Sequence, residues 1–220
     1  MHHRTLIKIC GLTRAEDVRA AVEAGADALG FVFYAGSSRY VTPEQAAELI
    51  ALVPPFISTV GLFVNASVED VVRTVAEAPV SLLQFHGDET PVQCAVAARA
   101  AARPFIRAAR VKPVMSAADL LQYERSYRAS GRLFSGLLLD AFVEGYGGAG
   151  KVFDWSLISE ELAHRVVLSG GLSVQNVAGA IASVRPFAVD VSSGVEHAKG
   201  VKDAGKIRAF ISEVRKADAA

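Results

Sequence analysis

Short runs of apolar residues alternate along the chain with longer segments in which apolar and polar residues recur at helical spacing. The run at 6–10 is followed by an amphipathic segment that stops at Gly25, and the run at 28–33 is followed by another. Strand-like runs that alternate with helical segments are typical of parallel sheets whose strands are joined by helices. Both faces of such a sheet are covered, which explains why these runs are apolar almost throughout.

The same unit recurs eight times along the sequence. Some helix starts carry capping signals: Thr13 with Glu16 forms a capping-box pattern, Pro43 suits a first helical turn, and Ser67 and Ser173 are expected N-caps. Strands are expected at 6–10, 28–33, 58–64, 80–85, 105–109, 133–139, 165–168 and 187–191, with helices that include 90–102, 117–127, 202–216 and a short one near Trp155.

Eight strand–helix units predict an α/β fold in which residues 1–220 form a single-domain (βα)8 TIM barrel. The competing topology is an open doubly wound sheet, which usually carries a glycine-rich dinucleotide turn after its first strand. That turn here reads Cys10-Gly11-Leu12-Thr13-Arg14 and lacks the fingerprint.

Composition narrows the class of partner. Hydrophobic residues make up 51% of the 220, and 23 basic residues balance 23 acidic ones. This balance gives no electrostatic reason to expect nucleic acid or an anionic membrane. No apolar run approaches the roughly 20 residues of a membrane span, residues 1–4 lack the apolar stretch of a signal peptide, and two cysteines far apart suit a reducing compartment. We therefore expect a cytoplasmic protein, monomeric or homodimeric, that acts on a small molecule.

The active site of a parallel barrel lies at the carboxyl ends of its strands. No His, Asp or Glu cluster there has metal-ligand spacing, and there is no nucleophile elbow, so neither a metal nor a cofactor is expected. The polar residues at these ends are Cys10, Ser37–Tyr40, Asn65, Gln84–Glu89, Arg107, Arg110, Asp140, Ser169–Gly171 and Asp190–Gly194.

Two of these ends are glycine-rich loops, Ser169-Gly170-Gly171 after the seventh strand and Ser192-Ser193-Gly194 after the eighth. Barrel enzymes commonly bind phosphate with these two loops, because glycine lets backbone amides approach an anion closely. Either loop alone could simply be a tight turn, but the presence of both favours a phosphate site.

The chemistry of the remaining candidates stays open from the residues alone. Asp140 could be an ion-pair partner or an acid–base group, and a free cysteine such as Cys10 most often behaves as a small buried hydrophobe. Lys8 shares the face of the strand that carries Cys10, which would be the barrel interior. A buried ammonium needs a partner, so we expect an ion pair between Lys8 and Asp190. This cation should also favour the Cys10 thiolate.

Two further side chains, Arg39 and His86, have both a functional and a structural interpretation. Arg39 is a planar fork suited to a carboxylate, although a loop arginine is usually an exposed cation. His86, which follows Gln84 by two residues, could orient a substrate or be a structural histidine. Cys94 lies among alanines in the middle of a predicted helix, where core packing is expected.

The ordered series of motifs resembles one known family, phosphoribosylanthranilate isomerase of tryptophan biosynthesis. The resemblance extends over nearly the whole chain. The motifs are Lys8-Ile9-Cys10-Gly11-Leu12-Thr13-Arg14, Gly30-Phe31-Val32-Phe33, Ser38-Arg39-Tyr40-Val41, Gly61-Leu62-Phe63-Val64-Asn65, Leu83-Gln84-Phe85-His86-Gly87-Asp88-Glu89, Leu139-Asp140-Ala141, Gly147-Gly148-Ala149-Gly150, Phe153-Asp154-Trp155, Ser169-Gly170-Gly171-Leu172 and Asp190-Val191-Ser192-Ser193-Gly194-Val195-Glu196.

The resemblance implies an isomerase on a (βα)8 barrel. The implied reaction is the Amadori rearrangement of N-(5-phosphoribosyl)anthranilate to 1-(o-carboxyphenylamino)-1-deoxyribulose 5-phosphate. It implies Cys10 as general base, Asp140 as general acid and Arg39 near the anthranilate carboxylate. The further residues expected to bind substrate are Gln84, His86, Gly170, Gly171, Ser192, Ser193 and Gly194.

Small departures and neighbouring families leave alternatives. The loop at 34–38 and Ala149 differ from the residues that are common in the family. The histidine-pathway ribotide isomerase performs the same rearrangement but resembles a design with a carboxylate where Cys10 stands. Indole-glycerol-phosphate synthase typically has a lysine and glutamates at its strand ends, which are not found here. A non-catalytic sugar-phosphate-binding barrel would bind product analogues without turnover.

Overall fold

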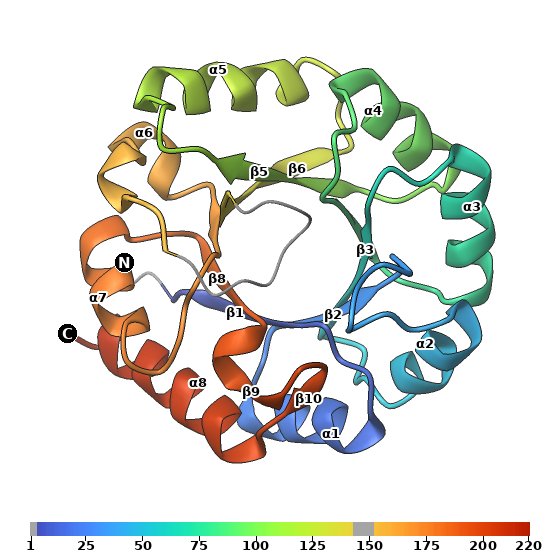
Figure 1. Ribbon diagram of the computed structural model, residues 1–220, viewed down its shortest axis with the longest axis horizontal. Helices are drawn as coiled ribbons and strands as arrows, with labels where there is room; N and C mark the ends of the chain where they lie inside the picture. The colour runs from blue at the N-terminus through green and yellow to red at the C-terminus, as the bar shows by residue number, and fades with distance from the viewer. Residues whose placement is uncertain (1–3, 143–151) are drawn as a thin grey trace.

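The computed structural model describes residues 4–142 and 152–220. Eight parallel strands close into a barrel in the order β1 to β8, with helices around the outside (Figure 1). Each strand pairs with the next one in sequence, and β8 returns to pair with β1. The predicted (βα)8 barrel is therefore confirmed. The Gly147–Gly150 motif, with its Ala149 departure, lies outside the described residues.

The element bounds lie close to those expected. No helix among the described residues is long and apolar enough to cross a membrane. The strands are β1 (Leu6–Cys10), β2 (Ala28–Val32), β3 (Ser58–Phe63), β4 (Leu82–Phe85), β5 (Phe105–Val111), β6 (Phe134–Ala141), β7 (Val167–Leu168), β8 (Ala188–Val191) and a hairpin of β9 (Glu196–Ala198) and β10 (Val201–Lys202); the helices are α1 (Ala15–Ala24), α2 (Pro43–Ile50), α3 (Val68–Glu77), α4 (Pro91–Ala100), α5 (Ala117–Arg128), α6 (Glu160–Ala163), α7 (Val177–Val184) and α8 (Ala204–Asp218), with 3-10 turns η1 (Trp155–Leu157) and η2 (Ser193–Val195).

Side chains alternate along each strand between the barrel interior and the layer under the helices. On β5 and β6, Ile106, Ala108 and Leu138 form a small interior cluster. Phe105 and Phe134 face the other way and pack against each other in the outer layer, with their rings tilted by 58°. Because the interior rows continue toward the carboxyl ends, polar residues two positions further along each row meet at the mouth of the barrel.

Local capping explains most of the helix starts. Thr42, next to Pro43, accepts a hydrogen bond from the backbone N–H of Gln45 within a capping box, and Ser67 caps α3 as predicted, accepting from the backbone N–H of Asp70. Each such cap contributes roughly 1 kcal/mol.

Two predicted caps are wrong. The hydroxyl of Thr13 donates instead to the carbonyl of Gly200 in the β9–β10 hairpin, so α1 begins later, with Arg14 at its N-cap. Ser173 does not cap α7: its backbone N–H donates to Oδ1 of Asn176, and α7 begins only after Asn176. In both cases a tertiary contact or a competing turn overrides the local signal.

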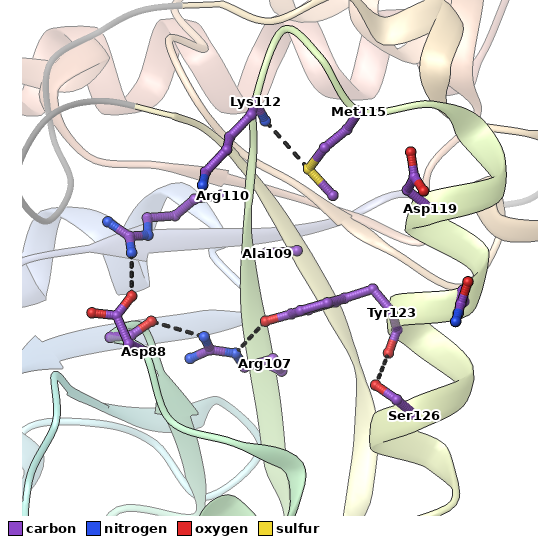
Figure 2. Close-up of a pocket in the computed structure, with 11 residues that line it drawn as sticks. Asp88, Arg107, Ala109, Arg110, Lys112, Met115, Asp119, Tyr123 and Ser126 are labelled. Atoms are coloured by element: carbon purple, nitrogen blue, oxygen red, sulfur yellow. Dashed lines mark hydrogen bonds and ion pairs between the residues drawn. The ribbon is translucent and has the colours of Figure 1, made fainter.

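Strands β5 and β6 are longer than expected, because they pair with each other as far as Val111 and Ala141. This extension places Asp140 inside β6, opposite Arg110. It also places Arg107 in mid-strand, where it points outward to Tyr123 of α5 and not to the barrel mouth (Figure 2). The expectation that Arg107 lies at the end of its strand is therefore wrong.

A buried thiol gives the fold a measurable dependence on pH. Cys94 is fully buried in the outer core, and burial raises its pKa to about 12. A thiol in the unfolded chain ionises near pH 8.5, so the unfolded state gains stability above that pH while folded Cys94 stays protonated. The free energy of unfolding should thus fall as pH rises from 8.5 toward 12. Between pH 8 and pH 10, urea titrations should show a fall about 2 kcal/mol larger for wild type than for Cys94→Ala; equal falls would contradict this.

Candidate active site

A buried ion pair lies at the base of the barrel mouth. The Lys8 ammonium donates to Asp190 Oδ1 at 2.8 Å, with both side chains at least nine-tenths buried. Lys8 and Asp190 are register partners on β1 and β8, and the Ser169 hydroxyl of the β7 loop donates to the other oxygen of Asp190. The predicted Lys8–Asp190 pair is confirmed. It ties together the elements that carry Cys10 and the two glycine loops.

Cys10 lies two residues after Lys8 on β1, closer to the barrel mouth than the ion pair, and is 5% exposed. Burial raises the pKa of the Cys10 thiol, and although Lys8 acts in the opposite direction, the net effect stays upward. Lys8 thus favours the thiolate in the expected direction, but the sequence does not signal the burial and the negative charge of Asp190, which keep the pKa of Cys10 raised. Gly30 on β2 leaves room for the thiol, since a Cβ there would lie 2.8 Å from Cys10 Sγ.

Asp140 belongs to a chain of hydrogen bonds across the mouth. Its Oδ2 lies 3.2 Å from Nε2 of His86, and Nδ1 of His86 lies 3.0 Å from Nε2 of Gln84. Gln84 is 0% exposed and His86 6%, whereas the Asp140 side chain is 13% exposed. The structure thus brings these three predicted residues together in one row.

The two glycine loops pack on each other and on the acid. Gly170 and Gly171 both have positive φ, and a Cβ at Gly170 would meet the backbone nitrogen of Ala141 and the carboxylate of Asp140. A Cβ at Gly194 would lie 2.0 Å from the carbonyl oxygen of Leu172. Only glycine fits these positions. Ser192 occupies the N-cap position of the short turn η2, which Ser193 begins, without a capping hydrogen bond from its side chain.

Arg39 crosses the mouth over Gly11, where its side chain occupies the space that a Cβ would need. Its Nε and Nη2 donate to the two oxygens of Glu196 at 2.6 and 2.8 Å. Lys202, from the β9–β10 hairpin, donates to the same carboxylate and to Ser192. Burial lowers the pKa of Lys202, whereas Arg39 and Lys202 together hold the pKa of Glu196 below its ordinary value despite burial.

Sequence reasoning missed this cluster. The sequence signals Glu196 only as part of a motif, and it predicts Lys202 at the start of a helix, whereas the structure places Lys202 in β10. The available signal was the spacing of two charges around a glycine, which is typical of a short hairpin that pairs them.

A separate pocket of about 610 Å³ lies outside the barrel, between β5 and α5 (Figure 2). Arg107 lines it but is held by Tyr123, Glu89 and backbone carbonyls. Arg110, on the interior row opposite Asp140, forms an ion pair with Asp88. Among the described residues, no group of His, Cys, Asp and Glu side chains could hold a metal ion.

A closed parallel barrel with a thiol, a carboxylate and two glycine loops at the carboxyl ends of its strands defines a (βα)8-barrel enzyme. Residues 7–213 match the family model of N-(5'-phosphoribosyl)anthranilate (PRA) isomerase. The chain belongs to this family of isomerases.

Individual relatives agree. An N-(5'-phosphoribosyl)anthranilate isomerase from Herminiimonas arsenicoxydans is 66% identical over 220 residues, which cover 100% of this chain and 97% of that protein. The crystal structure of the isomerase from Thermotoga maritima superimposes with a TM-score of 0.83 at 42% identity, covering 96% of this chain and 99% of that one. Another isomerase structure, in complex with reduced 1-(o-carboxyphenylamino)-1-deoxyribulose 5-phosphate, gives a TM-score of 0.81 at 40% identity and the same coverage.

Removing only one partner of the Lys8–Asp190 pair should lower the free energy of unfolding strongly. Lys8→Met leaves the Asp190 carboxylate buried without its cation, so unfolding free energy should fall by about 3–5 kcal/mol. The same change at Lys216, which pairs with Glu213 on the surface of α8, should cost less than about 1 kcal/mol. Denaturant titration of the two variants makes the comparison. If they lose equal stability, the buried pair has no structural role.

Proposed function

We propose that this chain converts N-(5-phosphoribosyl)anthranilate to 1-(o-carboxyphenylamino)-1-deoxyribulose 5-phosphate in tryptophan biosynthesis, with Cys10 as general base and Asp140 as general acid. The observation that carries the proposal is the placement of these two groups at one end of a barrel of this family, with Lys8 on the same strand face as Cys10 and His86 beside Asp140. The product analogue bound in the solved relative supports the substrate class.

The reaction needs one proton delivered and one removed. Asp140 gives its proton to the furanose ring oxygen, the C1–O bond breaks, and the nitrogen lone pair forms an iminium at C1. The Cys10 thiolate then takes the proton from C2, the electron pair forms the C1–C2 double bond, and the iminium becomes the neutral enol-amine. Tautomerisation of the enol-amine gives the ketone. A proton then passes from Cys10 through solvent back to Asp140, so atoms and charge balance with no cofactor, since the sugar is only isomerised.

The substrate's two anionic ends fit two different parts of the mouth. The phosphate fits the loops at Gly170–Gly171 and Ser192–Gly194, because glycine lets backbone amides approach an anion closely and the Lys202 ammonium lies within hydrogen-bond distance of Ser192. The anthranilate carboxylate fits Arg39, because Glu196 uses only the Nε–Nη2 edge of the guanidinium and an arginine fork offers a second edge. Binding at both ends holds the sugar between acid and base. A cytoplasmic location and a monomeric or homodimeric state remain predictions.

Turnover of freshly generated phosphoribosylanthranilate, followed by the loss of its fluorescence, tests the acid–base pair. Cys10→Ser and Asp140→Asn should each lower kcat at least about a hundredfold, because positioned proton transfer contributes 10²–10⁴. The matched control is Cys94→Ser, which removes the other buried thiol away from the mouth and should keep kcat near that of wild type. A wild type that binds a product analogue without turnover would instead indicate a sugar-phosphate-binding barrel.

The raised pKa of Cys10 predicts how the reactivity of the thiol depends on pH. Only the thiolate is a base or nucleophile, and below the thiol pKa its fraction grows about tenfold per pH unit. Because burial raises this pKa, the rate of Cys10 alkylation by iodoacetamide should still be rising between pH 7 and pH 9. A flat profile over this range would show that the thiol is already ionised at neutral pH.

A further inference from the structure

The row Gln84–His86–Asp140 contains a buried polar atom that no hydrogen bond explains. Oε1 of Gln84 has no partner among the described residues, although the side chain is 0% exposed. Such an atom costs stability, since a buried acceptor has lost its water without gaining a donor. Apolar residues fill the neighbouring interior positions, among them Ile106, the register partner of Gln84 on β5. An apolar side chain would fill this position equally well, so packing alone does not explain why a polar amide is buried here.

The hydrogen-bond chemistry of the row fixes the tautomer of His86. An amide nitrogen can only donate, so Nδ1 of His86, 3.0 Å from Gln84 Nε2, is the acceptor. A neutral imidazole then carries its proton on Nε2, and that proton points to Asp140 Oδ2 at 3.2 Å. This arrangement suits Asp140 as a carboxylate, the form it has after giving up its proton.

The unpaired oxygen of Gln84 gains a hydrogen-bond partner in the state in which Asp140 is protonated. When Asp140 is protonated and its O–H donates to Nε2, the neutral imidazole carries its one proton on Nδ1; the ring reaches this form by giving its Nε2 proton to Asp140 while Nδ1 takes up a proton from water. A half-turn of the Gln84 amide, whose oxygen and nitrogen have nearly the same shape, then presents Oε1 to Nδ1–H. We propose that Gln84 and His86 are positioning residues that hold Asp140 in both protonation states, with the Gln84 amide turning to match the tautomer of His86.

This role differs from direct contact with substrate, which the sequence led us to expect for both residues. Gln84 is completely buried, and its amide reaches the mouth only through the imidazole. Its contribution therefore belongs to kcat and not to KM. The inference rests on the proposed function, because it assigns the two residues to the acid of that reaction.

The first test is Gln84→Met, which keeps the length of the side chain and removes both the donor and the acceptor. We expect kcat for phosphoribosylanthranilate to fall about tenfold, with KM within about twofold of wild type. His86→Gln should lower kcat further, toward a hundredfold. The controls are Gln122→Met on the exposed face of α5 and His164→Gln at the end of α6, where the side chains are exposed and kcat should not change.

The second test reads the tautomer directly. In ¹⁵N-labelled wild type, the ring nitrogens of His86 should show one neutral tautomer, with the proton on Nε2 while Asp140 is a carboxylate and on Nδ1 while Asp140 is protonated, and in Gln84→Met the two tautomers should mix. Signals are assigned by their loss in His86→Gln. This measurement on wild type stands even if a variant fails to fold, and it does not depend on turnover.

The outcomes separate cleanly. The same distribution of His86 tautomers in wild type and in Gln84→Met overturns the proposal, as does a Gln84→Met enzyme with wild-type kcat. A higher KM at unchanged kcat would assign Gln84 to substrate binding instead. A wild type without isomerase activity refutes the proposed function, and the spectrum then still reports whether Gln84 sets the tautomer.

Discussion

The barrel mouth depends on one buried ion pair. Lys8 and Asp190 neutralise each other at the seam where β1 meets β8, and Ser169 on the neighbouring loop satisfies the remaining oxygen of Asp190. Without a partner, neither charge could be kept away from water. The pair therefore allows polar groups to occupy the top of an otherwise apolar interior. It also sets the surroundings of Cys10, whose pKa reflects burial opposed by the lysine and reinforced by the aspartate.

A second carboxylate organises the other side of the mouth. Glu196 joins Arg39 of the loop after β2 to Lys202 of the hairpin after β8. Its two cations approach from segments far apart in sequence, so the orientation of Arg39 depends on an element that follows the last strand. The glycines at 11, 170 and 194 complete this arrangement by leaving space where a side chain would collide with Arg39, Asp140 or Leu172.

The sequence predicted the architecture because the spacing of apolar residues within each segment determines whether that segment forms a strand or a helix. Each apolar run had to be a covered strand, and eight such units leave few topologies. It also predicted the Lys8–Asp190 pair, since a lysine on an interior row needs an anion. It did not predict the start of α1, because the hydroxyl of Thr13 bonds to Gly200 far along the chain. Nor did it predict the direction of the Cys10 pKa or the Glu196 cluster, which depend on burial and on distances between segments that no local pattern encodes.

The seam between the first and last strands also has a consequence for how the molecule matures. Lys8 and Asp190 are 182 residues apart, so β1 has no neighbour on that side until almost the whole chain has been synthesised. Contacts of such long range form late, because closing a long loop is entropically unfavourable. Until β8 docks, the ammonium of Lys8 remains hydrated and Cys10 is an ordinary accessible thiol. The environment that distinguishes this cysteine from any other is therefore acquired only when the barrel closes.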